Sequence, residues 1–248
     1  MKAYQYPAKA RVGQTIPKST LYQQGGASQA VQQLFITQVE SIHWAYKLSS
    51  ATVHMQDQKD LKEIQIFSIQ SRVPELDLSI LNYVDKLIPS PIIFEIIYQG
   101  QVKLVASYKR LNQADSTKVV IGEYYASEWM DDADRIELPV YLNLADLYAH
   151  FIRRLLPGNE LSRSISAQPH QIGDEQVGTY GYGLLNENRD GQAAESLEES
   201  LRKAEKIKSL QSQINRLKTK MHSERQFNHK VEVNRQIHLL ETQLRELG

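Results

Sequence analysis

The sequence predicts an α+β domain with a mainly antiparallel sheet and packed helices, then a flexible linker and a C-terminal coiled-coil or helical-hairpin arm. Three observations lead to this prediction. Helix-like and strand-like apolar patterns follow one another within residues 29–158, and residues 159–194 are rich in Gly, Ser, Gln, Asn and Asp. Within residues 195–248, the stretch from Ser196 to Leu247 contains neither Gly nor Pro and repeats apolar residues at three-and-four spacing.

The chain begins with a polar segment, residues 1–28, which holds four basic residues and no acidic one. Its Pro and Gly residues indicate an N-terminal tail or an ordered strap. The apolar residues of Ala30–Tyr46 have the spacing of one helix face, so a helix is expected there. Alternating apolar and polar residues then predict a strand at Leu61–Gln70.

The rest of the domain reads as a helix, a three-strand meander and a closing helix. Gly100 sits between the first two strands of the meander and indicates a short hairpin connection, and Pro157 stops the closing helix. The predicted elements, in chain order, are Leu76–Ile88, Ile92–Tyr98, Val102–Tyr108, Lys118–Tyr125 and Asn143–Leu156.

The composition of the chain limits its class. The 248 residues carry no net charge and include no cysteine, so disulfides, thiol nucleophiles and cysteine metal sites are excluded. No apolar run approaches the roughly 18 to 20 residues that a membrane helix needs. The N-terminus has basic residues but no apolar core typical of a secretory signal. We therefore expect a cytoplasmic protein that makes no membrane contact.

The arm carries two apolar seams, and such seams need a partner surface. The two seams are thirty residues apart along the chain, two more than four heptads. In one continuous helix they would therefore lie on different faces. The arm either folds back near residues 222–229, which we favour, or its halves contact different surfaces. The predicted partner-binding residues are Ile207, Leu210, Ile214, Leu217 and Met221, then Phe227, then Val233, Ile237, Leu240 and Leu244.

The same arm is basic. Between Arg202 and Arg235 the sequence holds ten basic residues against three acidic ones. A positive stripe of this kind attracts a phosphate backbone or an acidic protein face. The predicted nucleic-acid-binding residues are Arg216, Lys218, Lys220, Arg225, Lys230 and Arg235.

Motifs for catalysis are sparse. The sequence has no GxxxxGK[ST], HExxH or GxSxG pattern, and we predict neither a cofactor nor a metal site. The acidic cluster of Asp131, Asp132 and Asp134 is interpreted as a solvated loop before a strand.

A metal-dependent nuclease of the restriction-endonuclease type stays open as an alternative, because its signature is short. Asp57 or Asp60 would supply the first carboxylate, near Glu63. However, Gln70 and Arg72 stand where such an enzyme needs a Glu-x-Lys pair.

Several segments resemble the bacterial domain-of-unknown-function 4391 family. They are Thr15-Ile16-Pro17-Lys18, Glu63-Ile64-Gln65-Ile66-Phe67, Glu123-Tyr124-Tyr125-Ala126-Ser127-Glu128-Trp129, Leu144–Arg154 and, in the arm, Glu224 to Asn234. The resemblance implies no catalytic residues. It implies a context, since such proteins are commonly encoded beside DNA helicases and site-specific DNA methyltransferases in clusters that look like restriction or anti-phage defence systems.

These observations together predict a non-catalytic accessory or adaptor subunit of a bacterial DNA-targeting complex. Its arm is expected to dock on a helicase or DNA methyltransferase, with DNA as a further contact. The cryptic nuclease is one alternative function. A homodimer held by antiparallel pairing of the arm seams is the other.

Overall fold

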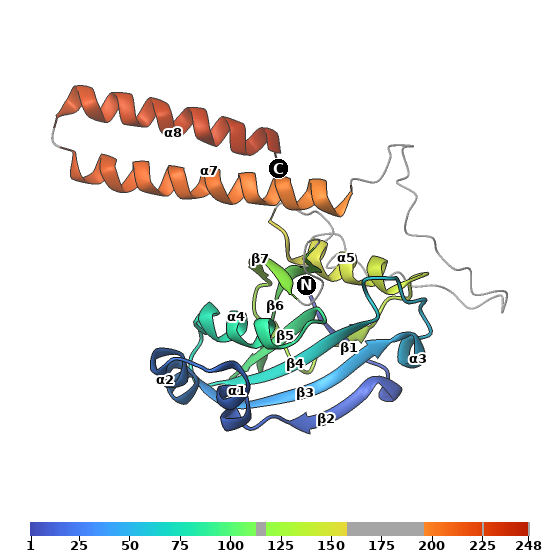
Figure 1. Ribbon diagram of the computed structural model, residues 1–248. Helices are drawn as coiled ribbons and strands as arrows, with labels where there is room; N and C mark the ends of the chain where they lie inside the picture. The colour runs from blue at the N-terminus through green and yellow to red at the C-terminus, as the bar shows by residue number, and fades with distance from the viewer. Residues whose placement is uncertain (113–117, 158–195, 225, 248) are drawn as a thin grey trace. The chain divides into compact units, whose positions relative to one another are not determined.

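The computed structural model describes residues 1–112, 118–157, 196–224 and 226–247 (Figure 1). It divides into two compact units, Met1–Leu155 and Leu156–Gly248. We call the first the front unit, and we call the two C-terminal helices of the second the arm. The front unit contains β1 Ala3–Gln5, a 3-10 turn at Ala8–Ala10, β2 Arg11–Thr15, α1 Lys18–Gly25, α2 Gln29–Gln38, β3 Val39–Ser49, α3 Ser50–Val53, β4 Glu63–Ser71, α4 Leu78–Leu87, β5 Ile92–Tyr98, β6 Gln101–Leu111, β7 Val119–Ala126, β8 Met130–Asp131, β9 Arg135–Glu137 and α5 Leu144–Leu155.

The main sheet runs in the order β2-β3-β4-β5-β6-β7, and the short β8 also pairs with β6. Neighbouring strands are antiparallel except β4 and β5, which are parallel and joined through α4. A second, two-stranded sheet pairs β1 with β9 in parallel. The predicted α+β class with a mainly antiparallel sheet is therefore confirmed.

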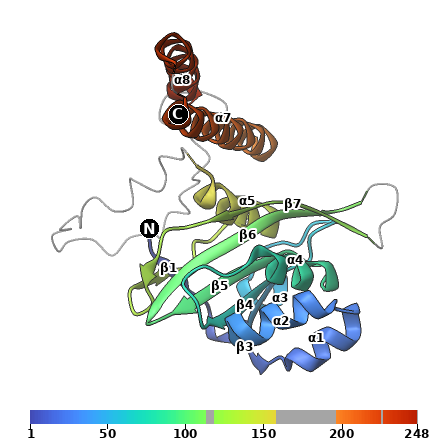
Figure 2. The ribbon, with the colours of Figure 1, turned by 90° about the vertical axis from the view of Figure 1, so that its left-hand side faces the viewer.

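Helices cover both faces of the main sheet. Figure 2 shows α1, α2 and α4 on one face and α5 on the other. The first face forms a core in which Phe35 of α2 and Val84 of α4 meet strand residues such as Phe67 and Phe94, all at most 2% exposed. Gly25 lets α1 approach α4 closely, because a β-carbon there would lie 2.3 Å from the Tyr83 hydroxyl.

The predicted hairpin connection is present between β5 and β6. Gln99 and Gly100 form its two-residue loop, with φ angles of 49° and 79°. Positive φ at both central positions is the conformation of a type I′ turn, whose twist matches that of the flanking strands. The strand and helix predictions on either side of this turn, from β4 to α5, also agree with the structure to within a few residues.

The helix predicted for Ala30–Tyr46 was wrong in its second half. Helix α2 ends at Gln38, and Val39 starts β3, which pairs with β4 over its length. The pairing register shifts between Val39 and Ser41, so two residues of β3 oppose one of β4. Such a bulge brings Val39 and Ile42 to the same sheet face at a spacing of three, which imitates the periodicity of a helix.

Residues 1–28, for which a tail or a strap was expected, contribute β1, β2 and α1 to the front unit. Every residue of β2 is exposed, which is why this edge strand shows no apolar alternation in the sequence. Lys18 anchors the segment, since its ammonium donates to the carbonyl oxygens of Phe35, at 3.1 Å, and of Val39. Those carbonyls lie at the C-terminal end of α2, where backbone acceptors lack helical partners.

A second lysine donates hydrogen bonds to the carbonyl oxygens at the C-terminal end of α4 in the same way. The Lys109 ammonium on β6 donates to the carbonyl oxygens of Asp85, Ile88 and Ser90 at 2.8–3.0 Å. It also forms an ion pair with the buried Asp85 carboxylate at 2.6 Å. Burial lowers the pKa of Lys109, and the negative charge of Asp85 opposes that shift. The ammonium thus supplies hydrogen bonds to three backbone carbonyl oxygens at and just beyond the C-terminal end of α4, two of them in partly buried residues.

Helix α5 is held to the rest of the front unit by a partly buried histidine between two tyrosines. The Tyr4 hydroxyl lies 2.6 Å from Nε2 of His150, and the Tyr141 hydroxyl lies 2.8 Å from Nδ1. Burial, with a smaller contribution from the charge of Arg153, lowers the pKa of His150 to about 4. The folded protein therefore holds this ring neutral at neutral pH.

We expect His150 to make the front unit acid-sensitive. In the unfolded chain the ring takes up a proton near pH 6.5, well before the folded protein does, so the free energy of unfolding should fall as the pH drops. Between pH 7 and about pH 4.5 this group should remove about 2 kcal/mol of stability. Urea unfolding at both pH values should show that His150→Gln, which keeps hydrogen-bonding groups but cannot titrate there, loses correspondingly less. Equal losses in both proteins would contradict this assignment.

Candidate functional site

A row of polar side chains crosses three neighbouring strands on the sheet face that β1 and β9 also approach. His43 of β3 pairs in register with Ser68 of β4, and Ser68 pairs with Glu95 of β5. The Ser68 hydroxyl donates to Oε2 of Glu95 at 3.4 Å. Glu95 is only 2% exposed, although its strand neighbours are almost all apolar. A buried carboxylate is stable only when it is paired and hydrogen-bonded.

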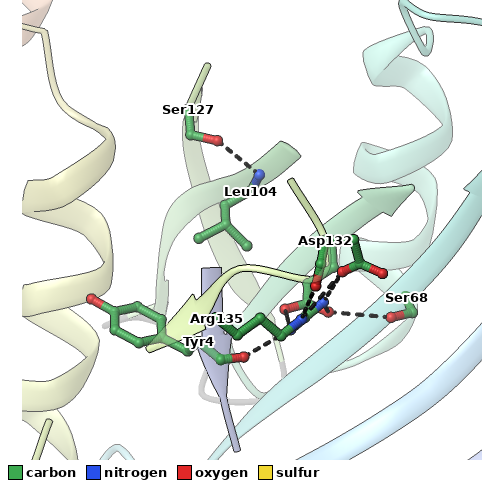
Figure 3. Close-up of polar contacts among 7 residues, drawn as sticks. Tyr4, Ser68, Leu104, Ser127, Asp132 and Arg135 are labelled. Atoms are coloured by element: carbon green, nitrogen blue, oxygen red, sulfur yellow. Dashed lines mark hydrogen bonds and ion pairs between the residues drawn. The ribbon is translucent and has the colours of Figure 1, made fainter. Parts of the chain in front are cut away.

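Arg135 at the start of β9 supplies that pairing (Figure 3). Its two terminal nitrogens donate to the two Glu95 oxygens at 2.9 and 3.2 Å. The guanidinium also donates to the Tyr4 carbonyl at 2.7 Å and to the Asp132 carboxylate. Burial alone would lower the pKa of Arg135, but the hydrogen bonds and charges of Glu95 and Asp132 raise it. The cation is therefore held permanently charged and fully engaged.

The polar row lies in a cavity of about 420 Å³. This volume is within the range of small-molecule sites in proteins. The lining residues come from six strands and the turn after β1: Tyr4, Gln5, Tyr6, Arg11, Gly13, His43, Ala45, Tyr46, Ser68, Glu95 and Arg135.

Two bulges shape one wall of the cavity. The register of β3 against β4 shifts between Trp44 and Tyr46. In a regular strand these two side chains would share one face of the sheet, but the bulge places Tyr46 on the opposite face, where it lines the cavity. The register of β2 against β3 shifts between Arg11 and Gln14, and Gly13 there has a φ of 66°. Bulges commonly re-aim side chains beside functional sites.

Tyr6 brings an unused polar group to the cavity. The residue is 5% exposed, and its buried hydroxyl lies close to the Glu95 carboxylate without making a hydrogen bond of ordinary geometry. Burial, and next the negative charge of Glu95, raise the pKa of Tyr6, so the phenol stays protonated. A buried hydroxyl without such a hydrogen bond is uncommon in native proteins.

The sequence analysis did not identify this cavity. A signal was available at Glu95, because it interrupts the otherwise apolar strand Ile92–Tyr98. A polar residue within a buried strand has to be satisfied by something, and functional sites are one common reason. Arg135 and Tyr6 offered no comparable signal, since their strand or turn is too short to show a pattern.

The arm consists of α7 (Leu197–Ser223) and α8 (Phe227–Leu247), which pack side by side as a hairpin (Figure 1). A capping box of Ser196 and Glu199 begins α7. The two seams face each other: Ile214, Val233 and Ile237 are buried at 3–5% exposure, with Leu217, Met221, Leu240 and Leu244 packed against them. Ile207 and Leu210 are buried as well. The side chain of Phe227 lies outside the described residues.

The predicted nucleic-acid-binding residues of the arm are exposed where the structure describes them: Arg216, Lys218, Lys220, Lys230 and Arg235. Arg225 lies outside the described residues. Lys218 forms an ion pair with Glu241 at 3.0 Å between partly solvated side chains. One flank of α7 forms a shallow polar hollow, whose described lining residues are Lys208, Gln211, Ser212, Asn215, Arg216 and Thr219.

The carboxylates considered for metal chemistry have other surroundings. Asp57 and Asp60 are exposed, and Glu63 pairs with Lys47 at 3.0 Å. Asp132 binds Arg135, Asp134 binds Lys2, and Asp131 accepts the backbone N–H of Ala133. Across the described ranges, no group of three or more His, Asp or Glu side chains is arranged to hold a metal ion.

The chain belongs to the family described as Domain of unknown function (DUF4391), whose model matches residues 5–244. The match covers nearly the whole chain and agrees with the resemblance of the individual motifs. No curated protein and no solved structure matches the chain. None of the helices in the described residues is long and apolar enough to cross a membrane.

Removing the cation from the buried pair should be costly. Arg135→Met leaves the Glu95 carboxylate buried without its partner, and we expect a loss of about 3 kcal/mol in the free energy of unfolding. Adding Glu95→Gln removes the stranded charge and should recover part of that loss. Urea unfolding of the single and double variants measures both effects. If the double variant were no more stable than Arg135→Met, the charge pair would not be the source of the loss.

Proposed function

We propose that this member of the DUF4391 family is a non-catalytic accessory subunit of a bacterial DNA-targeting complex that works in the cytoplasm. In this proposal the arm docks on a helicase or DNA methyltransferase and also contacts DNA. The partner class is the one that the resemblance to the family implies, through its defence-type gene neighbourhoods.

The observation that carries the proposal is that the hairpin buries its apolar side chains and leaves its basic side chains exposed. The apolar seams are buried between α7 and α8, so the arm has satisfied its own need for an apolar partner. What it offers to other molecules is its outer surface. That surface carries exposed basic residues and the polar flank of α7, which suit phosphate groups or an acidic protein face.

The arm also keeps some apolar surface for a protein partner. Val231 and Leu239 of α8 are 54% and 57% exposed. Exposed aliphatic side chains among charged ones are a common composition for a modest protein interface. The homodimer alternative would need the seams for a second copy, and the hairpin has already used them within one chain.

The protein contact can be tested by co-expression with a helicase or DNA methyltransferase from the same gene neighbourhood, the partner class that the family resemblance implies. The intact chain should co-purify with its partner, whereas V231D/L239D and a chain lacking residues 195–248 should not. V140D/L142D is a matched control, because Val140 and Leu142 of the front unit are each 70% exposed. Co-purification of V231D/L239D at the level of the intact chain would count against docking through the arm.

The DNA contact has a separate test in salt dependence. Affinity for duplex DNA, measured by fluorescence anisotropy over a range of salt concentrations, should fall steeply as salt rises. Replacing Arg216, Lys220 and Lys230 together by Gln should reduce the slope of log affinity against log salt by about 2 to 3, since each phosphate contact contributes about 0.9.

The control for that measurement replaces three exposed lysines of the front unit, Lys9, Lys59 and Lys62, by Gln. It removes the same charge from the protein but none from the arm. If both triple variants changed the slope equally, the effect would belong to net charge, and the arm would lose its assignment as a DNA contact.

A further inference from the structure

The cavity of the front unit combines three kinds of group that the proposed function does not use. Its floor carries the Glu95 carboxylate and the Tyr6 hydroxyl, its wall holds paired tyrosine rings, and its rim holds the Arg11 guanidinium. We propose that this cavity binds a nucleoside 5′-monophosphate whose base carries an exocyclic amino group.

The floor can read one edge of such a base. Each Glu95 oxygen accepts a hydrogen bond from one Arg135 nitrogen, and Oε2 also accepts one from the Ser68 hydroxyl. Oε1 therefore retains room to accept one more hydrogen bond. An exocyclic amine can donate to that position, as amino groups of bases do to Glu side chains. The Tyr6 hydroxyl lies close to Glu95 without a hydrogen bond of ordinary geometry, so it can donate to the ring nitrogen beside the amine when a base is bound.

The wall suits a flat ring. Tyr6 and Tyr46 lie with ring centroids 4.8 Å apart at an interplanar angle of 39°. The bulge at Ala45 is what brings Tyr46 to this face. Aromatic side chains are the usual platforms on which unpaired bases stack. A bare inorganic anion would leave these rings and the floor carboxylate without any complementary contact.

The rim supplies a charge for the phosphate. Arg11 on the edge strand β2 is exposed, and in the described part of the chain its guanidinium has no carboxylate partner. Its side chain lies over Gly13, with Nε 3.5 Å from the position that a β-carbon would take there. Arg135, by contrast, is fully engaged with Glu95, Asp132 and Tyr4, so Arg11 is the cation that remains open to a ligand.

Calorimetric titration of the full-length chain can test this assignment with AMP, CMP, GMP, UMP, adenosine and inorganic phosphate as probes. At least one of AMP, CMP and GMP should bind saturably at one site per chain. UMP lacks the amine and adenosine lacks the phosphate, so each should bind at least about tenfold more weakly than AMP if AMP is the ligand. Phosphate alone should not bind measurably.

Variants separate the rim from the floor. Arg11→Gln should weaken binding of the nucleotide about tenfold and leave binding of the nucleoside unchanged. Tyr6→Phe should weaken both. Lys9→Gln removes an exposed cation that does not line the cavity and should change neither. Arg11 lies on an exposed edge strand, so its variant should fold even if Tyr6→Phe does not.

Three results would overturn the proposal. They are the absence of saturable binding for every amino-bearing nucleotide, equal binding of UMP, and binding that Arg11→Gln leaves unchanged. Because no variant in this test alters the arm, its outcome is independent of the test of the proposed function.

Discussion

The front unit is organised around one buried charge. Glu95 stands in the middle of β5 among apolar residues, and a carboxylate in that position needs a cation and further hydrogen bonds. Arg135 meets the need from β9, and its remaining donors hold the Tyr4 carbonyl of β1 and the loop at Asp132. The small β1–β9 sheet is thereby tied to the centre of the main sheet. The same constraint brings the first residues of the chain against a segment about 130 positions later.

Elsewhere in the fold, polar side chains from distant segments complete interrupted backbone hydrogen bonding. The Lys18 ammonium donates hydrogen bonds to carbonyl oxygens at the C-terminal end of α2, and the Lys109 ammonium donates to carbonyl oxygens at the C-terminal end of α4. Tyr148 of α5 completes the backbone hydrogen bonding of β6 at the point where its register against β7 shifts. Its hydroxyl accepts from the backbone N–H of Lys109 and donates to the carbonyl oxygen of Ser107, each at 2.8 Å. These contacts lock helix ends and a bulge in place, because buried backbone groups must be paired.

The same contacts explain what the sequence could and could not predict. Strands β5 and β6, helices α4 and α5 and the two helices of the arm have strong local periodicity, and each was predicted with the correct type. The boundary between α2 and β3 was missed because a bulge gave strand residues a helical spacing. Strands β1, β2 and β9 have at most five residues each and depend on long-range partners such as Arg135 and Lys18. No local pattern announces a strand of that kind.

The two candidate sites differ in how far they could be predicted from the sequence. The arm seams could be read directly, because a hairpin buries a periodic stripe formed by one continuous stretch of chain. The cavity is assembled from β1 to β5 and β9, and its key side chains reach one face only through pairing register and two bulges. Once the seams pack on each other, the association proposed for the arm would depend on its exposed charges, which salt screens, and on the few aliphatic side chains left on α8. Recognition of a base in the cavity would instead depend on hydrogen bonds and stacking in a partly enclosed space, where salt has less influence than on the exposed Arg11 at the rim.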